Sequence, residues 1–242
     1  MSKLIIANWK MNPSTVSQAV KLARAEDKKG VVIAPPFPFL PLVSKVLRKA
    51  KLGAQDAFWV PKGAYTGEVS IHQLKTLRVK YVIIGHSERR GLGETDWLIN
   101  KKIRAALAED LTVILCVGEP WRVRRKGLAA AKRFVKQQLQ KDLKGTDKLT
   151  KLKAESLITA YEPVWAIGTG HADRPEGAVE MIKFIKKNLQ SKTYTLKSRV
   201  LYGGSVTGRN AAGFLKQKEI GGALVGGASL KPSEFKRIIR SL

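Results

Sequence analysis

Short apolar runs and segments with a helical apolar period alternate eight times along this chain, and this alternation restricts the possible folds more than any other feature. A strand followed by a helix, repeated, is typical of units whose strands lie parallel. The predicted strands are Leu4–Asn8, Val31–Ala34, Leu52–Gln55, Tyr81–Ile84, Thr112–Cys116, Leu157–Tyr161, Val200–Tyr202 and Ala223–Val225. The helical segments lie near residues 15–28, 40–50, 71–78, 95–109, 127–142, 176–190, 208–217 and 233–240. Eight such units predict an α/β fold, a closed (β/α)8 barrel.

The domain organisation follows from length and composition. A chain of 242 residues with 44% hydrophobic residues can bury a large core, and its length fits one α/β barrel or two small domains. No linker, low-complexity tract or shift of composition divides the sequence, and the polar stretch Lys144–Lys153 is too short to separate domains. We therefore expect residues 1–242 to form a single barrel domain.

Several classes of protein are excluded by the composition. The lone Cys116 follows the apolar residues Val113–Leu115, which indicates a buried strand-end thiol in a reduced protein and rules out an intrachain disulfide framework. There is no CxxC motif or His/Cys cluster, so no metal site is predicted. The N-terminal apolar stretch is too short for a signal peptide, and no stretch approaches the roughly 20 apolar residues of a membrane span. These features predict a soluble, cytoplasmic protein.

The charge is strongly unbalanced. The chain carries 45 Lys and Arg against 19 Asp and Glu, a formal net charge of +26. Eight of the basic residues lie between Glu119 and Asp142 without an acidic residue among them. Leu128, Ala131 and Val135 keep a helical period there, which favours an amphipathic helix with a solvated basic face. Non-specific attraction of a polyanion is also expected from this charge, although no recognised nucleic-acid-binding pattern accompanies it.

Catalytic groups of parallel barrels come from the C-terminal ends of the strands, so residues just after each predicted strand are the first candidates for a site. The first strand ends at Asn8 and delivers Lys10, and the fourth is followed by His86 and Glu88. The sixth strand ends before Glu162. Each has an ordinary alternative, since His86 could cap the next helix and Lys10 could be a solvated surface lysine. Their joint presence on one rim favours a catalytic site.

Strands seven and eight are followed by paired glycines. Gly203-Gly204-Ser205 follows the seventh and Gly226-Gly227 the eighth. Glycines let backbone N–H groups approach an anion closely, and barrels commonly bind phosphate at this position. The alternative is that these glycines merely turn the chain.

The segment after Glu162 is typical of a hinged lid. Pro163 fixes its own φ, the apolar run Val164-Trp165-Ala166-Ile167 follows, and Gly168-Thr169-Gly170 supplies a flexible far hinge. A carboxylate placed before such a lid suits the abstraction of a carbon-bound proton away from water.

Six stretches of this sequence together resemble the triosephosphate isomerase family, and they occur in the family's order from one end of the chain to the other. They are Ala7–Asn12, Gly63–Ser70, Gly85–Arg90, Ala160–Gly170, Tyr202–Val206 and Leu224–Leu230. The resemblance implies the interconversion of dihydroxyacetone phosphate and glyceraldehyde 3-phosphate through an enediolate, with no metal or organic cofactor. In that family the acid and base residues are tuned by their surroundings.

The resemblance also implies a role for each matching residue. Glu162 matches the base, and His86 matches a neutral imidazole that polarises the carbonyl. Lys10 and Asn8 match the groups that stabilise the oxyanion, and Glu88 matches a carboxylate beside the lysine. Gly168, Ser205, Gly226 and Gly227 match the phosphate grip. The lid is residues 163–170, Tyr202 and Ser205 match its latch, and Glu119 and Trp165 match a pair near its first hinge.

The loop Gly63–Ser70 resembles the one with which family subunits reach into each other, with Thr66 near the neighbour's active site, so the resemblance implies a homodimer. The chain departs from the family's pattern at His171-Ala172-Asp173, at Trp97 and in the basic turn Pro120–Lys126. Two other functions remain open at this point: an isomerase of another sugar phosphate, and a basic barrel that binds nucleic acid.

Overall fold

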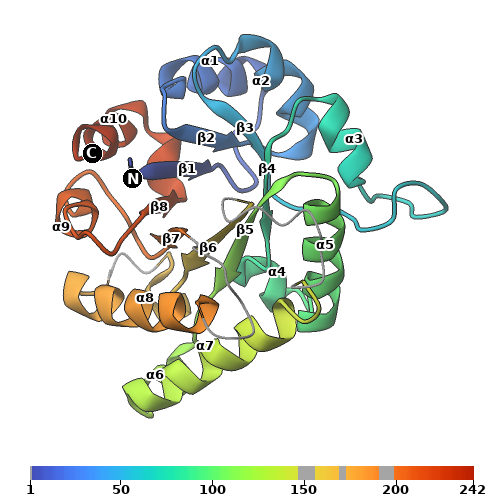
Figure 1. The fold of residues 1–242 in the computed structure, drawn as a ribbon. Helices are drawn as coiled ribbons and strands as arrows, with labels where there is room; N and C mark the ends of the chain where they lie inside the picture. Colours follow the sequence, from blue (N-terminus) through green and yellow to red (C-terminus); the bar gives the residue numbers. More distant parts are fainter. Residues whose placement is uncertain (1, 147–155, 169–172, 191–198) are drawn as a thin grey trace.

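A closed barrel of eight parallel strands forms the centre of the computed structural model, which describes residues 2–146, 156–168, 173–190 and 199–242 (Figure 1). The strands pair in sequence order, and β8 closes on β1. The barrel predicted from the sequence is confirmed. The strands are β1 Leu4–Asn8, β2 Val31–Ala34, β3 Lys51–Ala54, β4 Tyr81–Ile84, β5 Thr112–Val117, β6 Leu157–Tyr161, β7 Arg199–Tyr202 and β8 Gly222–Val225.

Helices surround the barrel in the figure, and most follow the predicted segments to within a few residues. They are α1 Val16–Glu26, α2 Leu40–Val46, α3 Ile71–Thr76, α4 Ser87–Gly91, α5 Asp96–Ala108, α6 Trp121–Arg124, α7 Leu128–Asp142, α8 Pro175–Leu189, α9 Ala211–Leu215 and α10 Pro232–Arg240. Short 3-10 turns occur at η1 Phe37–Phe39, η2 Val164–Ala166 and η3 Gly227–Leu230. The eight predicted helical segments did not include α4 and α6, and α9 is shorter than predicted.

Alternation along each strand divides the core into two layers. In β1, Ile5 and Ala7 pack outward in the large cluster with the helices, whereas Leu4 and Ile6 join the small cluster within the barrel. Strands buried on both faces read as nearly continuous apolar runs, which is why these segments were recognisable in the sequence. Side chains that continue the inner row beyond a strand end point toward the mouth of the barrel.

Helix starts agree with local capping chemistry. The hydroxyl of Thr15 accepts a hydrogen bond from Gln18 N at the start of α1, and Thr95 does the same for Leu98 N at α5. Ser70 and Gln73 form a reciprocal capping box at α3. In α7 the buried positions include Ala131 and Val135, so the amphipathic helix predicted for this basic segment is confirmed.

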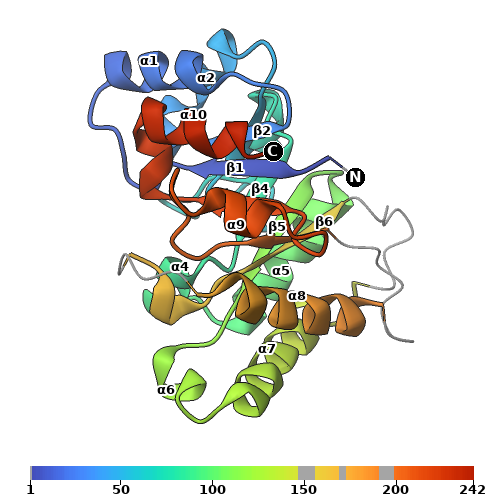
Figure 2. The same cartoon turned by 90° about the vertical axis from the view of Figure 1, so that its left-hand side faces the viewer.

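Two views show how the ends of the barrel differ. In Figure 2 the N-terminal end of β1 lies on the right, and α4 lies on the left, beyond the C-terminal ends of the strands. The segment between β3 and α3 projects away from the barrel in Figure 1. No described helix is both long enough and apolar enough to cross a membrane.

Barrel closure depends on Gly222 at the start of β8. Its φ is +148°, and a Cβ there would lie 1.8 Å from the carbonyl oxygen of Leu4 on β1. Gly222→Ala should therefore separate β8 from β1 and destabilise the fold by several kcal/mol, about the upper range for single substitutions. Gly91→Ala is the matched control, because a Cβ at Gly91 meets nothing within 4 Å. Urea unfolding followed by circular dichroism measures both, and equal midpoints for the two variants would contradict this account.

Candidate active site

A cavity of about 220 Å3 opens at the C-terminal end of the barrel, where the predicted site residues meet. Asn8 and Lys10 enter it from β1, His86 from β4 and Glu162 from β6. Gly168 and Ser205 line it as well, and the glycine pair Gly226 and Gly227 completes the β8 side. The structure thus brings together eight of the residues selected from the sequence, which come from five different segments of the chain.

The carboxylate of Glu162 lies at the cavity floor and is 2% exposed. Its Oε2 accepts a 2.9 Å hydrogen bond from Ser87 N, and its Oε1 lies 3.1 Å from His86 Nε2. That second contact lacks hydrogen-bond geometry, so Oε1 has no hydrogen-bond donor among the described residues. A buried carboxylate oxygen with no donor, facing a cavity, is available to take a proton from a bound molecule.

The imidazole of His86 is oriented by the helix that follows it. Glu88 N donates to Nδ1 at 3.2 Å, so Nδ1 carries no proton in this arrangement and Nε2 carries the proton of the neutral ring. The residue before it, Gly85, has a φ of +73°, which turns the chain out of the strand's alternation after Ile83. Because of that turn the imidazole lines the cavity, with Nε2 3.1 Å from Glu162 Oε1.

Lys10 is held from several sides. It pairs with Glu88, and its N–H donates to Asn8 Oδ1 at 3.0 Å. The Gln55 amide donates to Lys10 O and to Ala34 O, both at 2.8 Å. These bonds fix a backbone with a φ of +54°, a conformation that lysine rarely adopts. Gly226 leaves room for the lysine, since a Cβ there would lie 3.0 Å from Lys10 Cε.

The lid predicted after Glu162 is described as far as Gly168. Residues Val164–Ala166 form η2, and Trp165 Nε1 donates to Glu119 Oε1 at 3.1 Å. Ser205 Oγ, which follows β7, donates to Ala166 O at 2.5 Å. Thr169, Gly170, His171 and Ala172, for which a far hinge and a family departure were predicted, lie outside the described residues.

Glu119 is a buried carboxylate beside the start of the predicted lid. It is fully buried, and its carboxylate accepts hydrogen bonds from Tyr161 OH at 3.1 and 3.2 Å as well as from Trp165. Burial raises its pKa, and the hydrogen bond from Trp165 opposes that shift. The Tyr202 hydroxyl accepts from Asp173 N at 3.0 Å, so it contacts the chain just beyond the lid rather than the described part of the lid.

Two supporting residues were missed from the sequence. Gln55 was predicted as a strand end, and a polar residue at that rim position is a signal that could have identified it. Glu26 lies at the end of α1 and gave no signal, because its partner is an indole at a distance in sequence: Trp9 Nε1 donates to Glu26 Oε2 at 2.9 Å. The side chains of Trp9 and Glu26 are both fully buried. Trp9 directly precedes Lys10, so this bond helps to fix the backbone next to the strained lysine.

Comparison with known proteins agrees with the geometry of the site. The family model described as triosephosphate isomerase matches residues 3–242. The chain is 46% identical to the triosephosphate isomerase of Dictyoglomus turgidum over 251 aligned positions, which cover 99% of each protein. It is 42% identical to that of Aquifex aeolicus, with full coverage of both proteins. It is 41% identical to that of Thermus thermophilus, over 98% of this chain and 97% of the relative.

Glu26 gives the protein a pH-dependent stability. Burial raises its pKa from 4.5 to about 8, an effect that the bond from Trp9 only partly offsets. A raised acid pKa stabilises the fold below the unfolded pKa, and this stabilisation is lost as pH rises through the folded pKa. Between pH 4.5 and about 8 this group should therefore lower the free energy of unfolding by about 1.4 kcal/mol per pH unit.

Glu26→Gln tests this directly, because glutamine matches the shape of the neutral acid and does not titrate. Urea unfolding at several pH values should show that its stability falls less steeply than that of the parent over this range. Glu109→Gln is the control, since Glu109 is an exposed residue that pairs with Lys75. Identical slopes for the parent and Glu26→Gln would show that Glu26 is ionised in the folded protein.

Proposed function

The chain belongs to the triosephosphate isomerase family, and we propose that it interconverts dihydroxyacetone phosphate and glyceraldehyde 3-phosphate with the residues gathered around the mouth of its barrel. The observation that carries the proposal is the convergence of Glu162, His86 and Lys10 on one small cavity that is bordered by glycines. The activity is that of an intramolecular aldose–ketose isomerase, an enzyme of glycolysis.

The proton transfer is assigned to Glu162. Carbon acids are weak, so a carboxylate removes a carbon-bound proton only when water is excluded and the resulting oxyanion is stabilised. Glu162 is buried, and its Oε1 has no hydrogen-bond donor among the described residues. We assign it the removal of the proton from one substrate carbon and its return to the neighbouring carbon, which converts ketose into aldose through an enediolate.

Stabilisation of the oxyanion is assigned to three groups. His86 presents Nε2–H of a neutral imidazole to the substrate carbonyl, while Lys10 supplies positive charge and Asn8 an amide. Glu88 acts through Lys10, since their ion pair directs the ammonium group. These donors are fixed before the substrate arrives, so little reorganisation accompanies the development of charge.

The phosphate group is assigned to the other side of the cavity. Backbone N–H groups at Gly226 and Gly227 approach without obstruction by a side chain, and Ser205 and Gly168 line the same cavity. Gly168 follows η2, so phosphate contact there favours closure of the lid formed by residues 163–170. Ser205 also bonds Ala166 O, and together with Tyr202 it is assigned the latch.

The base assignment is tested with Glu162→Ala. We expect kcat for glyceraldehyde 3-phosphate to fall by roughly 10³-fold or more with a far smaller change in KM, because the side chain acts mainly in the transition state. Glu180→Gln is the matched control, as Glu180 is exposed on α8 and pairs with Lys132 outside the cavity. A coupled steady-state assay measures both, with ribulose 5-phosphate and glucose 6-phosphate as further substrates. Comparable turnover by Glu162→Ala and the parent would contradict the assignment.

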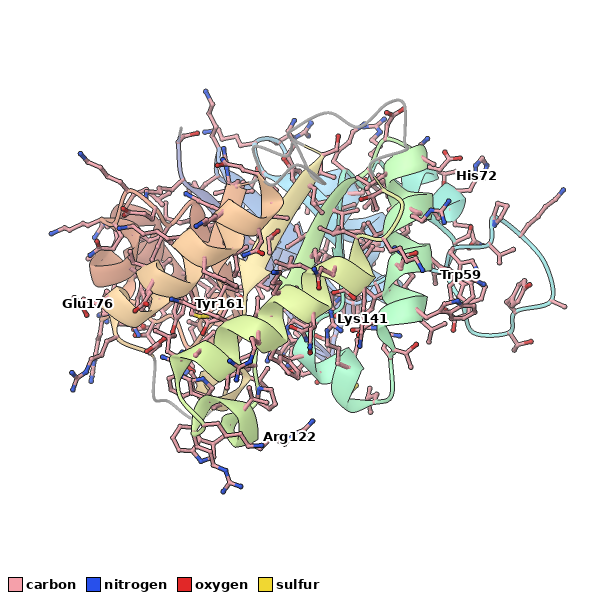
Figure 3. All side chains as sticks on the ribbon, turned by 60° about the horizontal axis from the view of Figure 1, so that its bottom comes forward. Trp59, His72, Arg122, Lys141, Tyr161 and Glu176 are labelled. Carbon is pink, nitrogen blue, oxygen red and sulfur yellow. The ribbon has the colours of Figure 1, made fainter. Side chains whose placement is uncertain are left out.

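A homodimer is proposed from the placement of exposed apolar side chains. Five of the seven large exposed apolar residues in the described chain lie in segments that follow β1, β3 and β4: Met11, Val16, Tyr65, Leu92 and Trp97. The loop that carries Thr66 is the segment that follows β3, and it projects from the barrel in Figure 1. Figure 3 places Trp59 on the same side as this loop, and its ring centroid is 6.3 Å from that of Trp97. Association would bury these residues and bring Thr66 to the neighbour's site.

Sedimentation velocity tests the dimer. At micromolar protein and roughly 0.15 M salt we expect a dimer, and lower salt should weaken it because two chains of +26 repel each other. Trp97→Glu should shift the equilibrium to monomer, whereas Trp121→Glu should not, although the two residues are 61% and 60% exposed. A parent protein that sediments only as a monomer would refute this part of the proposal.

A further inference from the structure

Seven basic residues gather at the N-terminal end of the barrel, away from the catalytic cavity. They lie in the three loops that lead into β2, β3 and β4, or at the first residue of the strand, and all are exposed. We name these residues the basic sector: Lys28, Lys29, Arg48, Lys49, Lys51, Arg78 and Lys80.

The three loops form one continuous surface. Strands β2, β3 and β4 are neighbours in the barrel, and adjacent strands lie about 4.8 Å apart. Lys80 N donates to Leu52 O at 2.9 Å, which joins the third loop to β3. The carboxylate of Asp27 accepts from the backbone N–H groups of Arg48, Lys49 and Ala50 at 2.7 to 2.8 Å, which joins the first loop to the second.

Little of the sector's positive charge is balanced by described residues, where Asp27 attracts Lys49 without forming an ion pair with it. None of its seven side chains takes part in an ion pair between described residues. Asp27 is the one acidic residue in these loops, and three backbone N–H groups already engage it. Two lysines on α7 differ from the sector, because Lys132 pairs with Glu180 and Lys141 with Asp96.

Capture of the substrate does not account for this surface. The strands are parallel, so the sector lies at the opposite end of the barrel from the cavity that contains Glu162 (Figure 2). Across the length of the barrel, the charges of the sector are largely screened from the cavity at physiological salt, where the Debye length is about 8 Å. The sector therefore suits a second ligand that is itself extended and strongly negative.

The absence of apolar groups narrows the class of ligand. None of the large exposed apolar residues in the described chain lies in the three loops that carry the sector. Binding at a membrane surface relies on apolar side chains that enter the lipid, and stacking on single-stranded bases relies on exposed aromatic rings. Lysine and arginine alone, spread over three loops, suit the regularly spaced phosphates of a duplex.

We propose that the basic sector binds the phosphate backbone of a nucleic-acid duplex without reading its base sequence. The duplex lies across the loops that precede β2, β3 and β4, and the mouth of the barrel stays open to the triose phosphate. Isomerase activity and duplex binding then occur on one molecule and do not compete.

Two variants with equal loss of charge test the location of binding. The first combines Lys29→Gln, Lys49→Gln, Lys51→Gln and Lys80→Gln. The matched control combines Arg122→Gln, Arg125→Gln, Arg133→Gln and Lys136→Gln, which are exposed residues of the α6–α7 region near the labelled Arg122 and Lys141 in Figure 3. The isomerase assay serves as the check that all three proteins fold, because neither set touches the cavity.

Fluorescence anisotropy with labelled RNA and DNA duplexes of about 20 base pairs, over a range of salt concentrations, measures binding. The parent should bind at roughly 0.1 M salt. The sector variant should bind at least tenfold more weakly, and its slope of log K against log salt should be shallower by up to about 3.6, or 0.9 for each of four lost phosphate contacts. The control variant should change affinity less than threefold. A difference between the RNA and DNA arms would identify the preferred duplex.

Three results would overturn the proposal: equal weakening in both variants, which would mean attraction by net charge alone; no binding by the parent at this salt; or binding of phosphatidylserine vesicles without binding of either duplex. Lysine acetylation footprinting on the parent provides a second test that needs no variant. Bound duplex should protect Lys29, Lys49, Lys51 and Lys80 but not Lys136, and uniform protection would contradict the assigned site.

Discussion

The closure of eight parallel strands into one barrel is the constraint on which the rest of this structure depends. Because no strand runs backward, every C-terminal strand end meets the same rim, and side chains far apart in sequence converge there without a dedicated scaffold. Asn8, His86 and Glu162 reach one cavity for this reason. For the same reason the loops that lead from a helix into the next strand all lie at the opposite end of the barrel, and three of them carry the basic sector. The topology therefore separates the proposed active site from the basic sector.

Buried charged side chains link the rim of the barrel to the surrounding helices. The guanidinium of Arg90 on α4 donates to Gly85 O at 2.8 Å and Cys116 O at 3.3 Å, and it also bonds Asp142 at 2.6 Å. Burial alone would lower the pKa of Arg90, but Asp142 and Asp96 outweigh it and raise the pKa, so the guanidinium is charged. One cation thus ties the end of α7 to the carbonyl that precedes His86. The position of His86 after β4 is thus supported by a residue that does not line the cavity.

The sequence predicted the parts of this protein that are periodic or that lie next to a strand end. Strands buried on both faces produce unbroken apolar runs, so β1, β2, β4 and β6 were predicted with their observed bounds. The helices α4 and α6 were missed because five and four residues are too few to show a helical period. Glu26 and Gln55 were missed as supports of the lysine, since a hydrogen bond such as that of Glu26 with Trp9 depends on tertiary packing and leaves no local pattern.

The basic turn before α7 shows that the charge excess has more than one origin. The sequence predicted a solvated basic face for the residues between Glu119 and Asp142, but Arg124 is only partly exposed. It lies 3.4 Å from Glu119 Oε1, and its guanidinium lies 5.5 Å from the Trp165 ring. Glu119 also bonds Trp165, so removal of the arginine would leave a buried carboxylate with less compensation at the hinge of the lid. Arg122, Arg125 and Lys126 are exposed. Arg124 therefore stabilises the start of the predicted lid, whereas its neighbours contribute to the long-range field and pair with no described acidic residue. The same division separates Lys10 at the mouth from the basic sector at the other end of the barrel.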